Sequence, residues 1–384
     1  MNRFLIACGT LTFVACGTPA ETPSDMGTTP AQDMAKAPIV DVTLPMPAKG
    51  FQLGTDSADV AAGQERQACY FFKVPDLNNG QPFYINKIEM AQNVGSHHMN
   101  IFRQNTVLAP DPNNPNVGLK GPNADGTGTV VSVDGKGACF YSANWADWPL
   151  VVNSQIPSLG PNGETQPYTL DLSANVKKDN VAYKFTPGEI LMLQSHFVNA
   201  STQKTPYKAK AVANFYQQTD TTNIQEVGTL FATKQSIAIC KNDPTPSYSG
   251  FCQVPGNAPI TIIAANGHFH SRGTEFKIAT WDGQSIDPAA GSQFYDSKTW
   301  DDPPMMTGLN ISAAAGTGIS YTCSYQWAPS PACADGCSCI KEPAGKTAAD
   351  CCYGFGGVVE ISEHCNAFVY YYPKLPAFSN KNCM

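Results

Sequence analysis

The sequence predicts an all-β protein with two antiparallel β-sandwich (jelly-roll) domains in tandem. Short segments of alternating apolar and polar residues recur between clusters of Gly, Pro, Asn and Asp, and long amphipathic helical periods are absent. Roughly 335 residues follow the N-terminal region, which is too long for one sandwich of typical size. The main alternating segments are residues 85–90, 99–103, 189–197, 211–217, 260–265, 275–281, 318–327 and 367–372.

The N-terminus has the features of an export signal. Met1-Asn2-Arg3 precedes a short apolar run, so residues 1–15 are predicted to be a signal peptide rather than a membrane span. The motif Phe13-Val14-Ala15-Cys16-Gly17 resembles a bacterial lipobox, which implies that Cys16 is lipidated. Residues 16–49 are rich in Pro, Thr, Ala and Ser, as in a flexible tether. We therefore expect an exported lipoprotein on the outer membrane or cell surface, attached to the membrane through its lipid only.

A polar stretch at residues 201–206 separates two runs of predicted strands. This stretch places the boundary between an N-terminal domain, residues 50–205, and a C-terminal domain, residues 206–384. Only 14% of the residues are charged, the net charge is −7, and no basic patch with interleaved aromatic residues is present. Nucleic acid is therefore excluded as an expected partner.

The cysteines also indicate an oxidising compartment. Without Cys8, in the signal peptide, and Cys16, 12 of the 14 cysteines remain, which is an even number and predicts disulfides. Five of them lie in a Gly- and Ala-containing insertion at residues 330–352, and these five offer a second interpretation as a thiolate copper site. They are Cys333, Cys337, Cys339, Cys351 and Cys352.

All six histidines lie in four short segments that read as strands or strand edges. They form two groups of three, one in each predicted domain: His97, His98 and His196, then His268, His270 and His364. Three neutral imidazoles with an open coordination position form a typical site for copper or zinc. The sequence therefore predicts two separate metal sites.

The local spacing supports shared ligation within each group. His268 and His270 are two residues apart, so both imidazoles lie on one face of a strand. His97 and His98 would point to opposite faces unless a β-bulge intervenes, and Gly95-Ser96 offers a place for one. His196 shares a strand face with Gln194.

These segments resemble, in order, motifs of the copper type II ascorbate-dependent monooxygenases, the family of peptidylglycine α-hydroxylating monooxygenase and dopamine β-monooxygenase. The matching segments are His97-His98-Met99, Leu193-Gln194-Ser195-His196-Phe197, His268-Phe269-His270 with Gly273, and Gly356-Gly357 before Glu363-His364-Cys365-Asn366. The resemblance covers most of residues 65–375. It implies an electron-transfer copper in the first domain, an oxygen-binding copper in the second, and Gln194 near the path between them.

The resemblance also implies a disulfide between Cys323 and Cys365, anchoring the strand that carries the last ligand. Cys69 and Cys139 are the only cysteines in the first half of the folded chain and are predicted to pair with each other.

Two departures from the family pattern affect the chemistry. His364 stands where the family has a methionine ligand, and an imidazole in place of a soft thioether stabilises Cu(II). Met305 and Met306 are the nearest alternative thioethers, although packing or a loop role is the favoured interpretation. Asn266 and Phe368 replace family residues that bind a peptide carboxylate, whereas Asn366 is kept. Asn266 and Asn366 are the candidate substrate-binding residues, and a peptidylglycine substrate is disfavoured.

The resulting functional hypothesis is a copper-dependent oxidoreductase with two copper ions per chain. In it, His268, His270 and His364 form the catalytic site with Gln194, and O₂ and ascorbate or another reductant oxidise a C–H bond of a small-molecule or peptide substrate. Two alternatives remain open. One is a non-catalytic copper-binding or copper-buffering lipoprotein, and the other is a zinc hydrolase.

Overall fold

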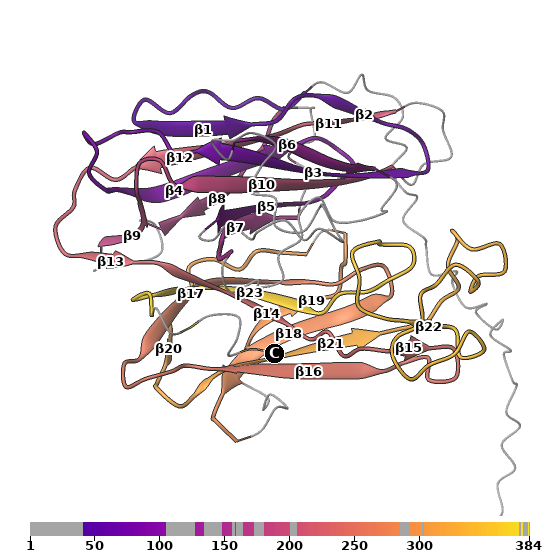
Figure 1. The fold of residues 1–384 in the computed structure, drawn as a ribbon. Coiled ribbons are helices and arrows are strands. Elements are labelled where there is room, and N and C mark those ends of the chain that lie inside the picture. The colour runs from indigo at the N-terminus through magenta and orange to yellow at the C-terminus, as the bar shows by residue number, and fades with distance from the viewer. Residues whose placement is uncertain are drawn as a thin grey trace, which may run out of the picture. The chain divides into compact units, whose positions relative to one another are not determined.

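The described part of the protein is all-β, as predicted. The structure is a computed structural model, and it describes residues 41–104, 127–133, 148–155, 158, 164–172, 180–199, 206–284, 292–301, 303–375, 378 and 383. These residues form 23 strands (Figure 1). Within the same ranges, no helix is long and apolar enough to cross a membrane.

The first 13 strands form two large sheets and one small one, drawn in indigo to pink in Figure 1. The six-stranded sheet has the order β1 (Gly50–Gly54), β12 (Ala211–Gln217), β4 (Phe83–Gln92), β9 (Asn180–Phe185) and β13 (Ile224–Glu226), with β8 (Tyr168–Asp171) also paired to β4. The five-stranded sheet has the order β6 (Gly128–Val133), β3 (Gln64–Lys73), β10 (Ile190–Asn199), β5 (Ser96–Gln104) and β7 (Leu150–Ser154). The small sheet pairs β11 (Tyr207–Ala209) with β2 (Ala58–Val60).

The remaining strands form two four-stranded sheets and one small sheet. One four-stranded sheet has the order β14 (Gly228–Thr233), β23 (Asn366–Tyr372), β17 (Ile260–His268) and β20 (Ile311–Ala313). The other has the order β16 (Ser247–Gln253), β21 (Gly318–Tyr325), β18 (Gly273–Trp281) and β19 (Gln293–Ser297). The small sheet pairs β15 (Ile239–Cys240) with β22 (Cys352–Tyr353).

Each of the eight predicted alternating segments lies largely within a strand. In β21, for example, Tyr321, Cys323 and Tyr325 are buried, and Thr322 and Ser324 between them are partly exposed. The two large sheets of the first half contribute side chains to one buried apolar cluster, and the second half has its own cluster. The first cluster also includes Phe231 and Phe368, so β14 and β23 extend it into the second half.

The change from one set of sheets to the other does not coincide with the predicted boundary at 205/206. β11, β12 and β13 follow that boundary but pair with first-half strands, and β12 lies between β1 and β4. The first strand that pairs only with second-half strands is β14, at Gly228. A polar stretch is equally typical of a connection within a domain, which is why composition placed the boundary early.

The folded part begins before residue 50, within the segment predicted to be tether. The Val42 side chain is buried and its backbone N–H donates to Asn93 Oδ1 at 2.8 Å. The Pro45 carbonyl accepts a 2.7 Å hydrogen bond from the Asn214 side chain. These hydrogen bonds use backbone groups, which do not depend on an alternation of apolar and polar residues. The sequence of residues 41–49 therefore gave no sign that this segment is folded. The signal peptide, Cys16 and residues 17–40 lie outside the described residues.

Disulfides crosslink the second half. The described pairs are Cys240–Cys352, Cys252–Cys383, Cys323–Cys365, Cys333–Cys339 and Cys337–Cys351. The predicted Cys323–Cys365 bridge is therefore confirmed. Cys69 is also disulfide-bonded, and its predicted partner Cys139 lies outside the described residues.

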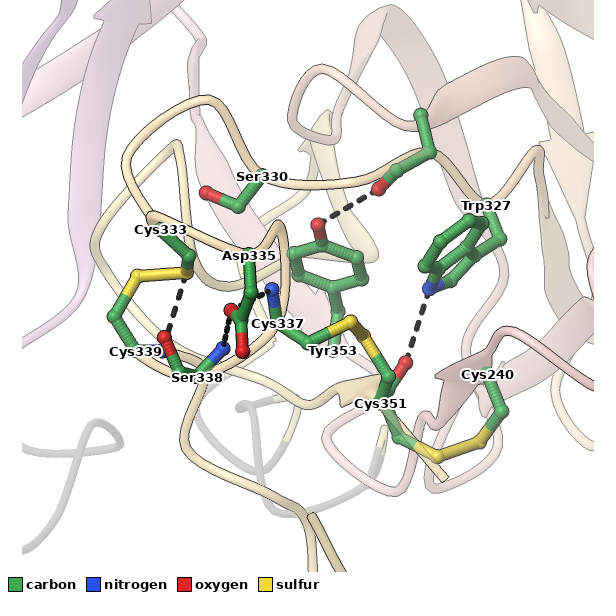
Figure 2. Close-up of a disulfide and its surroundings, with 12 residues drawn as sticks. Cys240, Trp327, Ser330, Cys333, Asp335, Cys337, Ser338, Cys339, Cys351 and Tyr353 are labelled. Carbon is green, nitrogen blue, oxygen red and sulfur yellow. Dashed lines mark hydrogen bonds between the residues drawn. A yellow bond between two sulfur atoms is a disulfide. The ribbon is translucent and has the colours of Figure 1, made fainter. Parts of the chain in front are cut away.

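The pairing excludes the thiolate copper site in the insertion, because every sulfur proposed for it is in a disulfide. Figure 2 shows the two bridges of the insertion beside the one to Cys240, with the Trp327 indole N–H donating to the Cys351 carbonyl at 3.0 Å. Disulfides at this density are consistent with an oxidising, exported compartment.

Candidate metal centre

All six histidines lie in one continuous group of rings, here called the histidine cluster. Ring centroids are 5.0 Å apart for His98 and His196, 4.9 Å for His97 and His268, and 4.3 Å for His270 and His364. His364 is partly exposed and the other five are buried. Two separate sites in two domains were expected, but rings from both groups are in contact. Spacing along the chain constrains neighbours within a strand and does not report how close two strands from different sheets come.

Two sets of ring nitrogens within the cluster are close enough to hold a metal ion. One set is His97, His98 and His268, the other is His268, His270 and His364, and all ligand atoms within a set lie within 4.8 Å of one another. The second set is the predicted oxygen-binding triad. The first differs from prediction because His268 takes the place of His196. His268 therefore belongs to both sets.

The predicted β-bulge brings His97 and His98 to the same cluster. In the pairing of β10 with β5, His196 lies opposite His98 and Phe197 lies opposite Ser96, so His97 is the extra residue. Gly95 precedes the bulge with φ of +88°, and a Cβ there would meet the Tyr207 ring at 2.4 Å. This position therefore requires glycine.

Gln155 determines which ring nitrogen of His268 carries the proton. The Gln155 amide nitrogen donates to the Gly267 carbonyl at 3.1 Å, which leaves Oε1 facing His268 Nδ1 at 2.7 Å. Because this oxygen only accepts, His268 carries its proton on Nδ1 and presents the lone pair of Nε2. His268 Nε2 is buried and has no hydrogen-bond partner. A buried lone pair without a partner is the state in which an imidazole binds a metal ion.

Backbone contacts orient His270 in the same way. Its Nδ1 lies 2.9 Å from the Ser362 carbonyl, an acceptor that places the proton on Nδ1 and the lone pair on Nε2. The buried Glu363 carboxyl accepts the backbone N–H of His270 at 2.9 Å and of Arg272 at 2.8 Å. Glu363 therefore ties the loop after β17 to the segment that carries His364.

His98 and His196 form a hydrogen-bonded chain that ends on a carboxylate. His196 Nε2 lies 2.9 Å from Glu65 Oε2, and its Nδ1 lies 3.3 Å from His98 Nε2. His98 Nδ1 in turn lies 3.2 Å from the Asn100 amide nitrogen, which also donates to Gln194 Oε1 at 3.0 Å. The Glu65 carboxylate therefore holds the His196 ring in place, and the His196 ring in turn holds that of His98. Gln194, predicted to act near the first group, contacts it through Asn100.

The partly exposed His364 is held by its chain neighbours. Its carbonyl accepts the Tyr325 hydroxyl at 2.6 Å, and Cys365 next to it is bridged to β21. Its Nδ1 is buried without a hydrogen-bond partner. Met305 packs against the first apolar cluster and the exposed Met306 forms a bridge with Ala265, in keeping with the packing role favoured for them.

Burial keeps most of these imidazoles neutral. Desolvation lowers the pKa of His97, His98, His268 and His364 well below the usual value, and the neighbouring imidazoles lower it further. Desolvation also lowers the pKa of His270 to about 4, although the hydrogen bond that its Nδ1–H donates to the Ser362 carbonyl acts in the opposite direction. Neutral rings are the form that ligates metals, so the cluster is ready to bind at neutral pH.

The two predicted substrate residues differ in position. Asn366 lines a cavity of about 180 Å³ that reaches His98, His268 and His364. Asn266 is buried in β17 and is not part of that lining. Sequence reasoning missed Glu65, Gln155 and Glu363. Only Glu363, directly beside His364, offered a local signal, because the other two reach the histidines from distant strands.

The neutral state of His270 has a measurable consequence. The unfolded chain binds a proton at His270 below about pH 6.5 and the folded chain does so only near pH 4, so the free energy of unfolding should fall as pH falls through this window. The shift corresponds to about 3 kcal/mol for this residue. The free energy of unfolding of the metal-free protein, measured by chemical unfolding, should therefore decrease between pH 7 and pH 4. In His270→Gln this decrease should be smaller by about 3 kcal/mol.

Comparison with His270→Gln isolates this contribution. Burial raises the pKa of Glu363 to about 8, so its ionisation lowers the stability as pH rises, which is the opposite sign. Glu363 is present in both proteins and its contribution cancels to first order. Identical pH profiles for the two proteins would show that His270 is not held neutral.

Comparison with known proteins does not assign the chain to a family. No protein-family model and no curated protein matches it. Among solved structures, a chain of the T13 IBDV viral particle aligns over 91% of this chain and 75% of its own length, with 8% identity and a TM-score of 0.18. A similarity this weak carries no argument about fold or function.

Proposed function

We propose that the protein is a copper-dependent oxidoreductase, similar in chemistry to the copper type II monooxygenases, that oxidises a C–H bond of a small substrate with O₂ and a reductant such as ascorbate. The observation that carries the proposal is the histidine cluster. It holds six imidazoles, and buried ring nitrogens of His97, His268 and His364 have no hydrogen-bond partner. Such nitrogens cost free energy unless a ligand satisfies them.

The donor set fits copper. Imidazole is a good ligand for Cu(II) and Cu(I), and the described residues around the cluster supply no thiolate. When bound, copper would exchange electrons with the reductant and activate O₂. The chain's own residues hold and orient the ligands: Gln155 presents Nε2 of His268, the Ser362 carbonyl presents Nε2 of His270, and Glu65 holds His196.

The surroundings favour oxidation over hydrolysis. The cavity beside His268 and His364 is lined by aromatic rings and neutral amides, with no carboxylate, ammonium or guanidinium group among its described lining residues. A zinc hydrolase commonly uses a general base beside the metal-bound water. An apolar wall with neutral polar groups is better suited to position a C–H bond.

The proposal leads to a specific copper-loading experiment. Metal-free protein should bind two coppers per chain by elemental analysis. Because His268 belongs to both ligand sets but presents a single lone pair, it can ligate only one ion at a time, so the second copper should bind more weakly than the first. Ascorbate should then support O₂ consumption. Exclusive binding of zinc would refute the proposal, whereas copper binding without O₂ consumption would indicate the copper-buffering alternative.

The same proposal covers the finer architecture and location. The first two large sheets share one apolar cluster, and strands of the other two contribute to a second, which supports two β-sandwich domains. The disulfides support export, and with the lipobox-like motif at Cys16 they support a lipoprotein held at the outer membrane or cell surface. Metabolic labelling with a fatty acid, lost in Cys16→Ser, tests the anchor.

A further inference from the structure

The cavity next to the histidine cluster has the size and lining of a binding site for a small organic molecule. It measures about 180 Å³ and is bounded by His98 from β5 and by His268 and His364 from the second half. An engineered protein cavity of about 150 Å³ binds benzene, so a single aromatic ring with one substituent fits this volume. A molecule in this cavity would lie against the proposed metal ligands.

Part of the cavity lining is aromatic. Phe102, Phe231, Phe355 and Phe368 all line it. Phe231 and Phe368 are stacked with ring centroids 5.0 Å apart and an interplanar angle of 11°. The Phe355 ring lies 4.7 Å from the His364 ring. Flat aromatic surfaces favour a flat apolar partner through stacking and edge contacts.

The lining also carries an amide donor whose orientation is fixed. The Tyr370 hydroxyl accepts the Asn153 backbone N–H at 3.1 Å and donates to Asn153 Oδ1 at 2.6 Å. The Asn153 amide therefore cannot be reversed, and Nδ2 is a donor. Asn153 is fully buried, lines the cavity, and its Nδ2 has no hydrogen-bond partner.

A second polar atom of the lining also has no partner. Asn366 Oδ1 is buried without a hydrogen bond. The other amides near the ligands are engaged, Gln155 with His268 and Gln194 with Asn100. Asn153 and Asn366 thus offer one donor and one acceptor to whatever fills the cavity. Unsatisfied buried polar groups carry a penalty that a matching ligand removes.

We infer that the cavity binds a small uncharged aromatic compound with a hydroxyl or amide group that accepts from Asn153 and donates to Asn366. The described lining contains no group that would neutralise an ammonium or a carboxylate, and an unpaired charge in such a site is strongly disfavoured. The inference deepens the proposed function by making this compound the substrate. Binding itself does not depend on that function.

Ligand binding tests the inference directly. Benzyl alcohol, acetophenone, toluene and benzylamine can be titrated into metal-free and copper-loaded protein by calorimetry or ligand-observed magnetic resonance. Benzyl alcohol should bind in both states, and benzylamine, which is positively charged at neutral pH, should bind at least tenfold more weakly. Equal affinity for the amine and the alcohol would overturn the inference.

Two variants locate the polar contacts. Asn153→Leu should weaken benzyl alcohol and acetophenone by about tenfold and leave toluene unchanged, because only the donor is lost. Asn366→Ala should weaken benzyl alcohol but spare acetophenone, which has no hydrogen to donate. Toluene binding shows that each variant is folded, and Asn366→Ala decides the question if Asn153→Leu does not fold. Equal weakening of toluene, or no weakening of the alcohol, contradicts the assignment.

The outcomes separate this inference from the proposed function. Copper binding with ascorbate-dependent O₂ consumption, but without binding of benzyl alcohol, would overturn the ligand class and leave the oxidoreductase proposal intact. Binding of benzyl alcohol by a protein that takes up no copper would overturn the oxidoreductase proposal and leave the ligand class intact.

Discussion

Replacing His268 with alanine is expected to remove the tighter copper site, with at least a hundredfold loss of its affinity, because neither ligand set then keeps three histidines. His268 belongs to both ligand sets, and its Nε2 is held as a buried lone pair by Gln155. Changes to residues that merely orient a ligand already cost about 10- to 100-fold in metal affinity, so removal of a shared ligand should cost more. Competition titration with a Cu(I) chelator and elemental analysis give the two measurements.

His364→Ala is the matched control for that experiment. His364 belongs to one ligand set only, so this variant should keep one copper at the affinity of the tighter site, on His97, His98 and His268. Thermal unfolding of both metal-free variants checks that the fold is retained. If His268→Ala keeps one copper at the affinity of the tighter site, the two sites are independent, and the originally predicted triads would describe the protein better than a shared cluster.

Orientation of His268 through Gln155 also shows where sequence reasoning reaches its limit. The HxH spacing is local, so the strand that carries His268 and the closeness of its ring to that of His270 could be predicted, although β17 ends at His268 and His270 lies in the loop after it. Gln155 lies more than one hundred residues away and belongs to the first half, yet it decides which nitrogen of His268 is free. A single sequence holds no signal for such a contact, because it exists only after the sheets have packed.

The difference between local spacing and contacts across distant segments also explains why the strand pairing around the predicted domain boundary and the contacts between the two histidine groups were not predicted. The bulge at His97 could be predicted because Gly95-Ser96 stands directly before it. The pairing of β12 with β1 and β4 could not, since strand order depends on which distant segments meet. His196 was grouped with His97 and His98 by its position in the first half, whereas its ring nitrogens contact His98 and Glu65.

Removal of the Cys323–Cys365 disulfide is expected to destabilise the metal-free protein by about 4 kcal/mol. The bridge closes a loop with a sequence separation of 42 and joins β21 to the start of β23, which belong to different sheets. The chain-entropy relation gives about 4 kcal/mol for a loop of this length. The double variant Cys323→Ala/Cys365→Ala leaves no free thiol at this bridge. Because both cysteines are fully buried, it also adds a small packing loss. Chemical unfolding at neutral pH measures the change.

The Cys333–Cys339 disulfide provides the comparison, because its sequence separation is only 6. The same relation gives about 2 kcal/mol for that loop. The two double variants should also differ at the metal centre: His364 is adjacent to Cys365, so only the first variant should weaken copper binding to the set that contains His364. Equal loss of stability in both variants, with copper binding unchanged in the first, would show that the Cys323–Cys365 bridge does not position His364.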